Sequence, residues 1–85
     1  MLRITKVIDE ASSMATLKLE GRLAGEWVEL LEGECLQCLK EKRKVRLDFS
    51  DVTFVNEKGL KMLGRLAEEN IEIIDHSGLI KNSLK

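Results

Sequence analysis

The feature that most constrains this chain is strict alternation of apolar and polar residues in two separate segments, Met14–Glu20 and Val45–Phe49. A period of two predicts strands, because successive side chains of a strand point to opposite faces of a sheet. A strand that lies beneath helices on both faces is apolar throughout. These two strands instead keep one polar face, made of Thr16, Lys18, Glu20, Arg46 and Asp48. The pattern therefore predicts a sheet with helices on one face only.

Further strands and helices are predicted around these two segments. The β-branched residues of Leu2–Ile8 predict a strand that forms an antiparallel hairpin with Met14–Glu20. Between the alternating segments, one stripe at helical spacing is apolar: Trp27, Val28, Leu31, Cys35, Cys38 and Leu39. Leu30 and Leu36 fall outside this stripe. The predicted order is strand, strand, helix, strand, helix, strand and short helix, at residues 2–8, 14–20, 26–42, 45–49, 56–69, 71–74 and 77–85.

Asn56 is predicted to cap the second long helix, because its side chain can accept a hydrogen bond from the free amides of the first turn. The residues of this helix that we expect to face the core are Gly59, Leu60, Leu63, Leu66 and Ala67. Gly59 lacks a side chain and so allows the helix to approach the neighbouring strand closely. The apolar residues of Ser50–Val55 are expected to lie in a connection.

Residues 1–85 are therefore predicted to form a single α/β domain. Its small mixed sheet combines the N-terminal hairpin with parallel strand–helix units, whose crossovers are right-handed and place both helices on the same face. The last strand, Ile71–Ile74, is expected at or near an exposed edge of the sheet.

The charge of the chain excludes several classes of function. Lys and Arg total 14, Asp and Glu total 15, and the net charge is -1, so no basic footprint for nucleic acid or an anionic membrane is present. Aromatic residues are only 4%, which disfavours stacking onto bases or sugars. The mixed N-terminus, Met1–Lys6, does not resemble a signal peptide, and no apolar run reaches membrane-spanning length. We expect a cytoplasmic protein without membrane contact.

No pattern of residues in the chain indicates a catalytic, cofactor or metal site. Cys35-x-x-Cys38 lies in the C-terminal half of its helix, where the dipole disfavours a thiolate, so core packing is the preferred interpretation. Zinc needs about four ligands, and His76 is the only histidine. Asp48 and Asp51 near the second helix could suggest Mg²⁺, but turn support is preferred for Asp51. Trp27 is a candidate partner anchor, with a place in the core preferred.

Two segments resemble the STAS family of anti-sigma-factor antagonists and sulfate-transporter domains. The first is the strand that leads into a Gly-x-Leu turn, Leu17–Leu23, and the second is Val45–Leu60, with a strand ending in Asp and Ser, then Val-Thr-Phe, then a helix start at Gly59-Leu60. The resemblance implies a STAS-like fold and a bacterial regulatory domain that binds a protein partner, such as an anti-sigma-factor-like kinase or another regulator, and that is not an enzyme.

The chain departs from the family at its switch. Aligned on Gly59, the family's Asp-Ser-Ser is Asn56, Glu57 and Lys58, so Glu57 stands where the phosphorylated serine is found. Glu57 could act as a fixed mimic of phosphoserine; the preferred interpretation is that it only complements the helix dipole. Family members usually continue through a further strand and a longer helix, so part of their binding surface has no counterpart here.

Strand-to-helix connections gather at the carboxyl ends of parallel strands, which is where open α/β sheets place their sites. The residues predicted to bind a partner at this end, or along the outward face of the second helix, are Arg22, Asn56, Glu57, Lys58, Lys61 and Arg65. Two alternatives remain: a small-ligand or nucleotide sensor at the same loop, and a structural module that forms a homodimer through an edge strand.

Overall fold

The computed structural model describes residues 2–75, which form four strands and two helices. In chain order these are β1 (Leu2–Asp9), β2 (Met14–Leu23), α1 (Glu26–Lys40), β3 (Lys44–Val55), α2 (Glu57–Leu66) and β4 (Ile71–Ile74). His76 and the predicted terminal helix at 77–85 lie outside the described residues.

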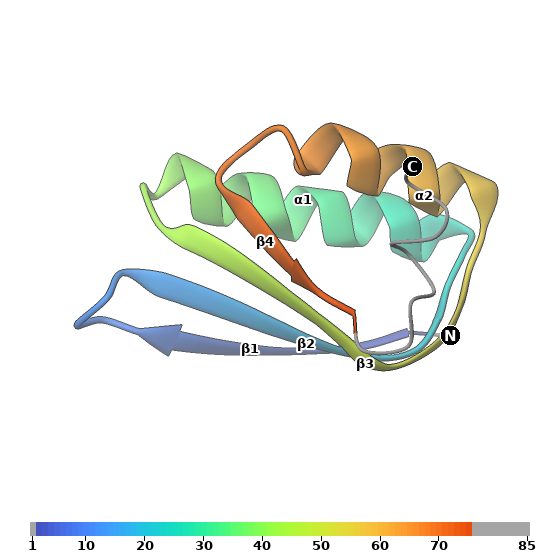
Figure 1. Ribbon diagram of the computed structural model, residues 1–85, viewed down its shortest axis with the longest axis horizontal. Coiled ribbons are helices and arrows are strands. Elements are labelled where there is room, and N and C mark those ends of the chain that lie inside the picture. The colour runs from blue at the N-terminus through green and yellow to red at the C-terminus, as the bar shows by residue number, and fades with distance from the viewer. Residues whose placement is uncertain (1, 76–85) are drawn as a thin grey trace.

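The four strands form one mixed sheet in the order β1-β2-β3-β4. β1 and β2 pair antiparallel as a hairpin, whereas β2 pairs parallel with β3 and β3 pairs parallel with β4. Both helices lie on the same side of the sheet (Figure 1). The predicted fold is therefore confirmed, including the one-sided arrangement that the polar strand faces required.

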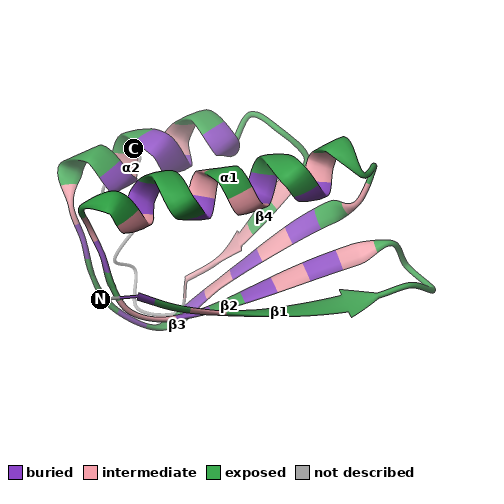
Figure 2. Ribbon diagram, turned by 180° about the vertical axis from the view of Figure 1, so that it is seen from behind, coloured by how far each residue is buried: buried purple, intermediate pink, exposed green. Residues whose placement is uncertain are grey.

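The core lies between the sheet and the two helices, and Figure 2 shows buried positions alternating with less buried ones along β2 and β3. The buried strand residues are Leu2, Ala15, Leu17, Leu19, Leu23, Val45, Leu47, Phe49, Val52 and Val55, and the buried helix residues include Val28, Leu31, Cys35, Cys38, Met62, Leu63 and Leu66. Full burial of one large apolar side chain is worth about 1.5–3 kcal/mol. One predicted core residue was wrong: Ala67 follows the end of α2 and is exposed, while Met62 occupies the core.

The predicted connection Ser50–Val55 was also wrong, because it continues β3, and β2 likewise continues to Leu23. Beyond Asp48 the two strands stay paired through register shifts, which end with Leu23 opposite Val55. The Asp48 carboxylate accepts hydrogen bonds from the backbone N–H of Ser50 (2.9 Å) and from its hydroxyl (2.6 Å) at this irregularity. Strand pairing is favoured here because it satisfies backbone groups that a loose connection would leave to solvent.

α1 ends at Lys40, two residues before the predicted end. Lys42 adopts a left-handed φ of 62°, and its N–H donates to the carbonyl of Leu39 at 2.9 Å. The N–H of Arg43 donates to the carbonyl of Cys38 at 3.0 Å. This pair of bonds is a Schellman motif, which satisfies the last helical carbonyls and reverses the chain toward β3.

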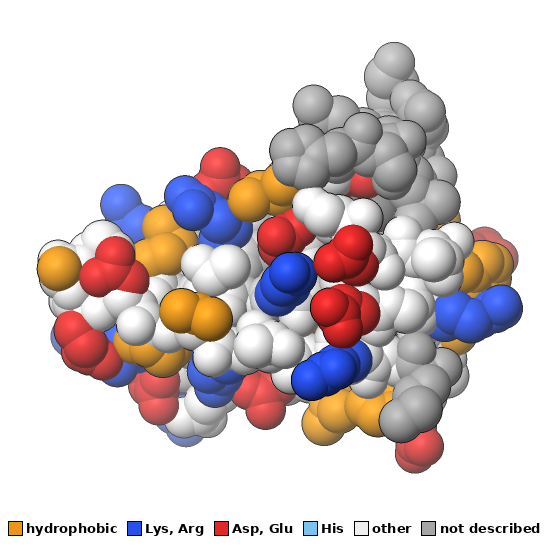
Figure 3. Space-filling model, turned by 90° about the horizontal axis from the view of Figure 1, so that it is seen from below, with side chains coloured by type: hydrophobic (Ala, Val, Ile, Leu, Met, Phe, Trp, Pro, Cys, Tyr) orange, Lys and Arg blue, Asp and Glu red, His pale blue; other side chains and the backbone are white. Residues whose placement is uncertain are grey.

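The face of the sheet away from the helices is charged. Figure 3 shows basic and acidic side chains lying side by side near the middle of this face. Arg46 contacts Glu72 at 2.9 Å, and looser pairs at 3.9 Å join Arg3 to Glu20 and Lys18 to Asp51. Within residues 2–75, neither helix is long and apolar enough to cross a membrane.

The close approach of α2 to the sheet predicts opposite effects of alanine at two glycines. A Cβ on Gly59 would lie 2.9 Å from Cγ1 of Val55 and 3.1 Å from Oδ1 of Asn56, whereas a Cβ on Gly33 in α1 would meet nothing within 4 Å. We expect Gly59→Ala to lower the free energy of unfolding by about 1–3 kcal/mol through overpacking. The matched Gly33→Ala variant should raise it by about 0.5–1 kcal/mol. Urea denaturation of both variants measures the difference, and equal effects would contradict this account.

Candidate functional site

The curled ends of β2 and β3 deliver the chain to the N-termini of both helices at one end of the molecule (Figure 1). The N–H of Asn56 donates to the carbonyl of Leu23 at 3.1 Å, which fastens the start of α2 to the end of β2. The two segments predicted to meet at the carboxyl ends of the strands therefore do meet, through paired backbone rather than through loops.

Asn56 caps α2 as predicted. Its side-chain Oδ1 accepts a hydrogen bond from the N–H of Gly59 at 2.7 Å, and the residue is half-buried. A side-chain cap of this kind is worth about 1 kcal/mol. The cap fixes where α2 begins, and so it fixes the positions of the charged residues that follow.

Glu57 stands in the first turn of α2 with a side chain that is 86% exposed. Its carboxylate lies 3.7 Å from the ammonium of Lys61, one helical turn later. A pair at this spacing stabilises a helix by only a few tenths of a kcal/mol. The helix start thus sets the position of the Glu57 backbone, and the carboxylate remains open to solvent.

Lys58, Lys61 and Arg65 are all largely exposed on α2, as predicted. Two of them also reach across to α1. Lys58 contacts Glu29 at 3.3 Å and Arg65 contacts Glu32 at 3.1 Å. The surface is consequently a strip of alternating charge shared by both helices. The acidic partners Glu29 and Glu32 of α1 were not predicted from the sequence. Their three-residue spacing on the polar side of α1 was the signal that could have indicated them.

Arg22 lies on the curled end of β2, where its guanidinium stacks over the ring of Phe54 at 4.6 Å from the ring centre. Phe54 is 39% exposed, and its neighbour Thr53 donates a hydroxyl hydrogen bond to the carbonyl of Gly21 at 3.2 Å. Phe54 was expected in a connection at this end, and it lies instead near the end of β3 as a partly exposed ring. A cation over such a ring is worth about 0.5–1 kcal/mol at an exposed site.

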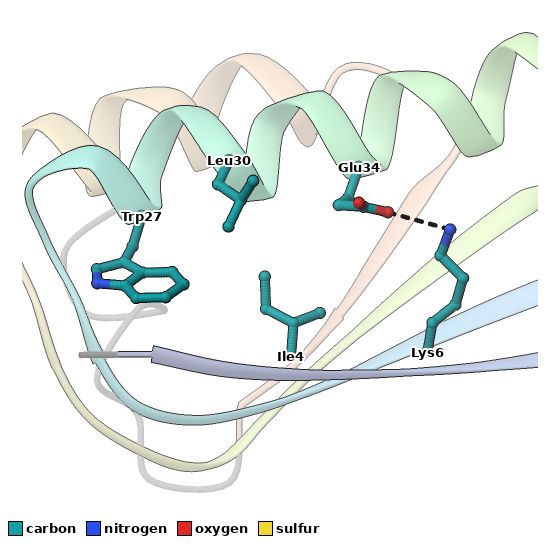
Figure 4. Close-up of a pocket in the computed structure, with 5 residues that line it drawn as sticks. All are labelled: Ile4, Lys6, Trp27, Leu30 and Glu34. Carbon is teal, nitrogen blue, oxygen red and sulfur yellow. Dashed lines mark ion pairs between the residues drawn. The ribbon is translucent and has the colours of Figure 1, made fainter.

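A cleft of about 370 Å³ lies elsewhere, between α1 and β1, and is lined by Ile4, Lys6, Trp27, Leu30 and Glu34. Figure 4 shows Trp27 and Leu30 pointing from α1 toward Ile4, with the Lys6–Glu34 ion pair at one end of the group. That pair is 3.0 Å long, and the bond to Glu34 raises the pKa of the Lys6 ammonium. Trp27 is half-buried: it packs against the core, as preferred from the sequence, and also lines this cleft.

Both cysteines are free thiols that are buried in the core beneath α1. Burial raises the pKa of Cys35 from 9.0 to about 12, and burial also raises the pKa of Cys38. Neutral thiols of this kind are poor nucleophiles. Among residues 2–75, no group of three or more histidine, cysteine or acidic side chains is placed to hold a metal ion.

Comparison with solved structures shows the fold. The chain is similar to the anti-sigma factor antagonist SpoIIAA in its unphosphorylated form, with a TM-score of 0.74 and 15% identity over 95% of this chain and 80% of that chain. It is also similar to a structure described as a crystal structure analysis of Mglu, with a TM-score of 0.66 and 17% identity over 84% of this chain and 19% of that one. Neither the family models nor the curated proteins give a match. The molecule thus has a STAS-like fold.

Buried Cys35 predicts a particular dependence of stability on pH. Its folded pKa of about 12 exceeds the ordinary value of 9.0. The unfolded chain therefore loses this proton first, and the free energy of unfolding falls above pH 9 by up to about 1.4 kcal/mol per pH unit. Cys35→Ala should be less stable than the native chain by about 1–2 kcal/mol at pH 7, and the gap should narrow from pH 9 to pH 11. Urea denaturation across this range measures the gap; rapid thiol labelling at neutral pH would contradict the prediction.

Proposed function

We propose that this chain is a non-catalytic, cytoplasmic regulatory domain of the bacterial anti-sigma-factor-antagonist type, which binds a protein partner through the start and outer side of α2. The observation that carries the proposal is the capped N-terminus of α2. There Asn56 fixes the helix start, and Glu57 stands at the position that the resemblance assigns to a phosphorylated serine. The STAS-like fold supports the general class of function.

The character of this surface favours a protein as the occupant. It combines exposed charges of both signs that are shared between α1 and α2. Alternating charge gives a partner orientation and register more than raw affinity. The clefts lined by Trp27 and Leu30 do not include residues of the Asn56 loop, so they lend no support to the small-ligand alternative at that loop.

We further propose that binding is constitutive rather than gated by phosphorylation. The carboxylate of Glu57 is a permanent charge, so the state of this surface does not change with kinase activity. A carboxylate has one charge and two oxygens, against about -1.5 to -2 and three oxygens for a phosphate group. It therefore resembles phosphoserine only partly. An acidic residue that only complemented the helix dipole would stand at the same place in the first turn.

Reversal of the two fixed charges tests the surface. In the variant Glu57→Lys with Lys58→Glu, the Lys58–Glu29 and Glu57–Lys61 pairs are both lost. Exposed pairs of this kind contribute a few tenths of a kcal/mol each, so the melting temperature should fall by only a few degrees. Capture of a partner from the source cell should nevertheless weaken, and titration of the captured and purified partner should show the loss growing as salt is lowered.

The matched control exchanges a charge pair on the opposite face of the sheet. Arg46→Glu with Glu72→Arg reverses the 2.9 Å ion pair there and leaves α2 unchanged. It should capture the partner as well as the native chain does. Equal binding by the α2 variant and the native chain would place the partner site elsewhere, and unfolding of the α2 variant would mean that these residues serve the fold.

A kinase assay tests the absence of a switch. When incubated with an anti-sigma-factor kinase and ATP, the native chain should gain no phosphate, because position 57 offers a carboxylate instead of a hydroxyl. The Glu57→Ser variant restores the acceptor and should become modified if the docking surface is retained. Intact mass spectrometry reports the modification. Phosphate on Thr53, whose hydroxyl is engaged with Gly21, or on another hydroxyl near Asn56 would overturn the prediction.

A further inference from the structure

β1 is an outer strand of the sheet: within residues 2–75 its strand partner is β2 alone. It is eight residues long, whereas β4 at the other edge has four. The outer row of backbone N–H and C=O groups on such a strand is a template for pairing with another chain. Val7 and Ile8 are 58% and 36% exposed, so this edge also carries apolar surface.

The cleft beneath α1 lies directly beside this edge. Ile4 of β1 forms its floor, with Trp27 and Leu30 above it (Figure 4). Leu30 is 49% exposed, although it points toward the sheet. An apolar side chain from a strand added next to β1 would enter this space on the helix side of the sheet.

The sequence of β1 is complementary to itself when two copies run antiparallel with Lys6 at the centre. Arg3 would then lie opposite Asp9 of the second copy on the open face of the sheet. Ile4 would lie opposite Ile8 of the second copy on the helix face, beside the cleft. Opposite charges and apolar pairs directly across antiparallel strands each contribute about 0.2–1 kcal/mol. A two-fold axis applies every such pair twice.

A shift of the pairing by one residue would move every side chain to the wrong face of the sheet, so the competing registers differ by two residues. Both of these registers lose the Arg3–Asp9 and Ile4–Ile8 pairs. A pairing centred on Thr5 would set Arg3 opposite Val7 and Ile4 opposite Lys6, and a pairing centred on Val7 would set Thr5 opposite Asp9 and Lys6 opposite Ile8. The charge pattern of the strand therefore selects one register.

Lys6 is the residue that opposes this pairing, because an inward-pointing lysine on an edge strand discourages association. Here its ammonium contacts the carboxylate of Glu34 at 3.0 Å. At the two-fold axis, two such ion pairs would lie side by side, so each lysine would meet a second carboxylate as well as a second lysine. The arrangement weakens the association without forbidding it.

We propose that β1 is the interface of a reversible two-fold homodimer, in which two sheets join antiparallel in the Lys6-centred register and Ile8 of each copy packs at the cleft of the other. This interface is separate from the α2 surface, so its test is independent of the partner experiment.

Charge-reversed variants test the register. Arg3→Asp and Asp9→Arg should each raise the dimer dissociation constant by about tenfold or more, because both symmetry-related pairs become repulsive. An equimolar mixture of the two variants should associate about as well as the native chain, since the mixed dimer has two attractive contacts, one native Arg3–Asp9 pair and one pair between the two substituted residues with the signs exchanged. Sedimentation equilibrium from micromolar to millimolar concentration measures all four samples.

Cross-linking keeps the proposal falsifiable if Asp9→Arg disturbs the hairpin turn, where Asp9 accepts a hydrogen bond from Ala11. The single change Lys6→Cys places a thiol on the two-fold axis and should form an intermolecular disulfide under mild oxidation. Lys18→Cys, on the open face of the central strand β2, should not. A native chain that stays monomeric at millimolar concentration would overturn the proposal. So would equal cross-linking of the two cysteine variants, or a mixture no more associated than its components.

Discussion

The parallel pairing of β2 with β3 is the constraint on which the rest of this structure depends. It runs from Met14 opposite Lys44 to Leu23 opposite Val55, through two irregularities that bend both strands together. Because both strands end at the same level, α1 and α2 begin side by side and return across the same face of the sheet. The core, the capped start of α2 and the ion pairs between the helices all follow from that common end point.

Much of this arrangement could be predicted, because it depends on local patterns in the sequence. Alternation at Val45–Phe49 depends only on which face of a strand is buried, and the cap at Asn56 depends only on residues within one helical turn. The extension of β3 to Val55 could not be predicted in the same way, because it depends on a partner strand that is distant in sequence. Its burial pattern changes from a period of two to a period of three beyond Phe49, which hides the strand signal.

The candidate site shows the same division between local and distant information. Glu57 and Lys61 could be paired from their spacing alone, and the structure has this pair. The partners of Lys58 and Arg65 belong to α1, about 30 positions earlier in the chain, and were missed. The cleft at Ile4 was not predicted for a related reason. Leu30 lies outside the apolar stripe of α1, and its part in lining a cleft becomes evident only when β1 is placed beneath α1.

Buried residues and exposed residues contribute very differently to the stability of this domain, and this difference decides which residues can vary. The buried residues of both helices and the central strands hold the fold, whereas exposed ion pairs add little to stability. Residues such as Glu57 and Lys58 can therefore vary at small cost in stability while α2 keeps its place. The two proposed surfaces lie on different sides of α1, one toward α2 and one toward β1. A dimer through β1 would thus present two α2 surfaces at once, and a partner with two matching sites would bind it more tightly than either surface alone.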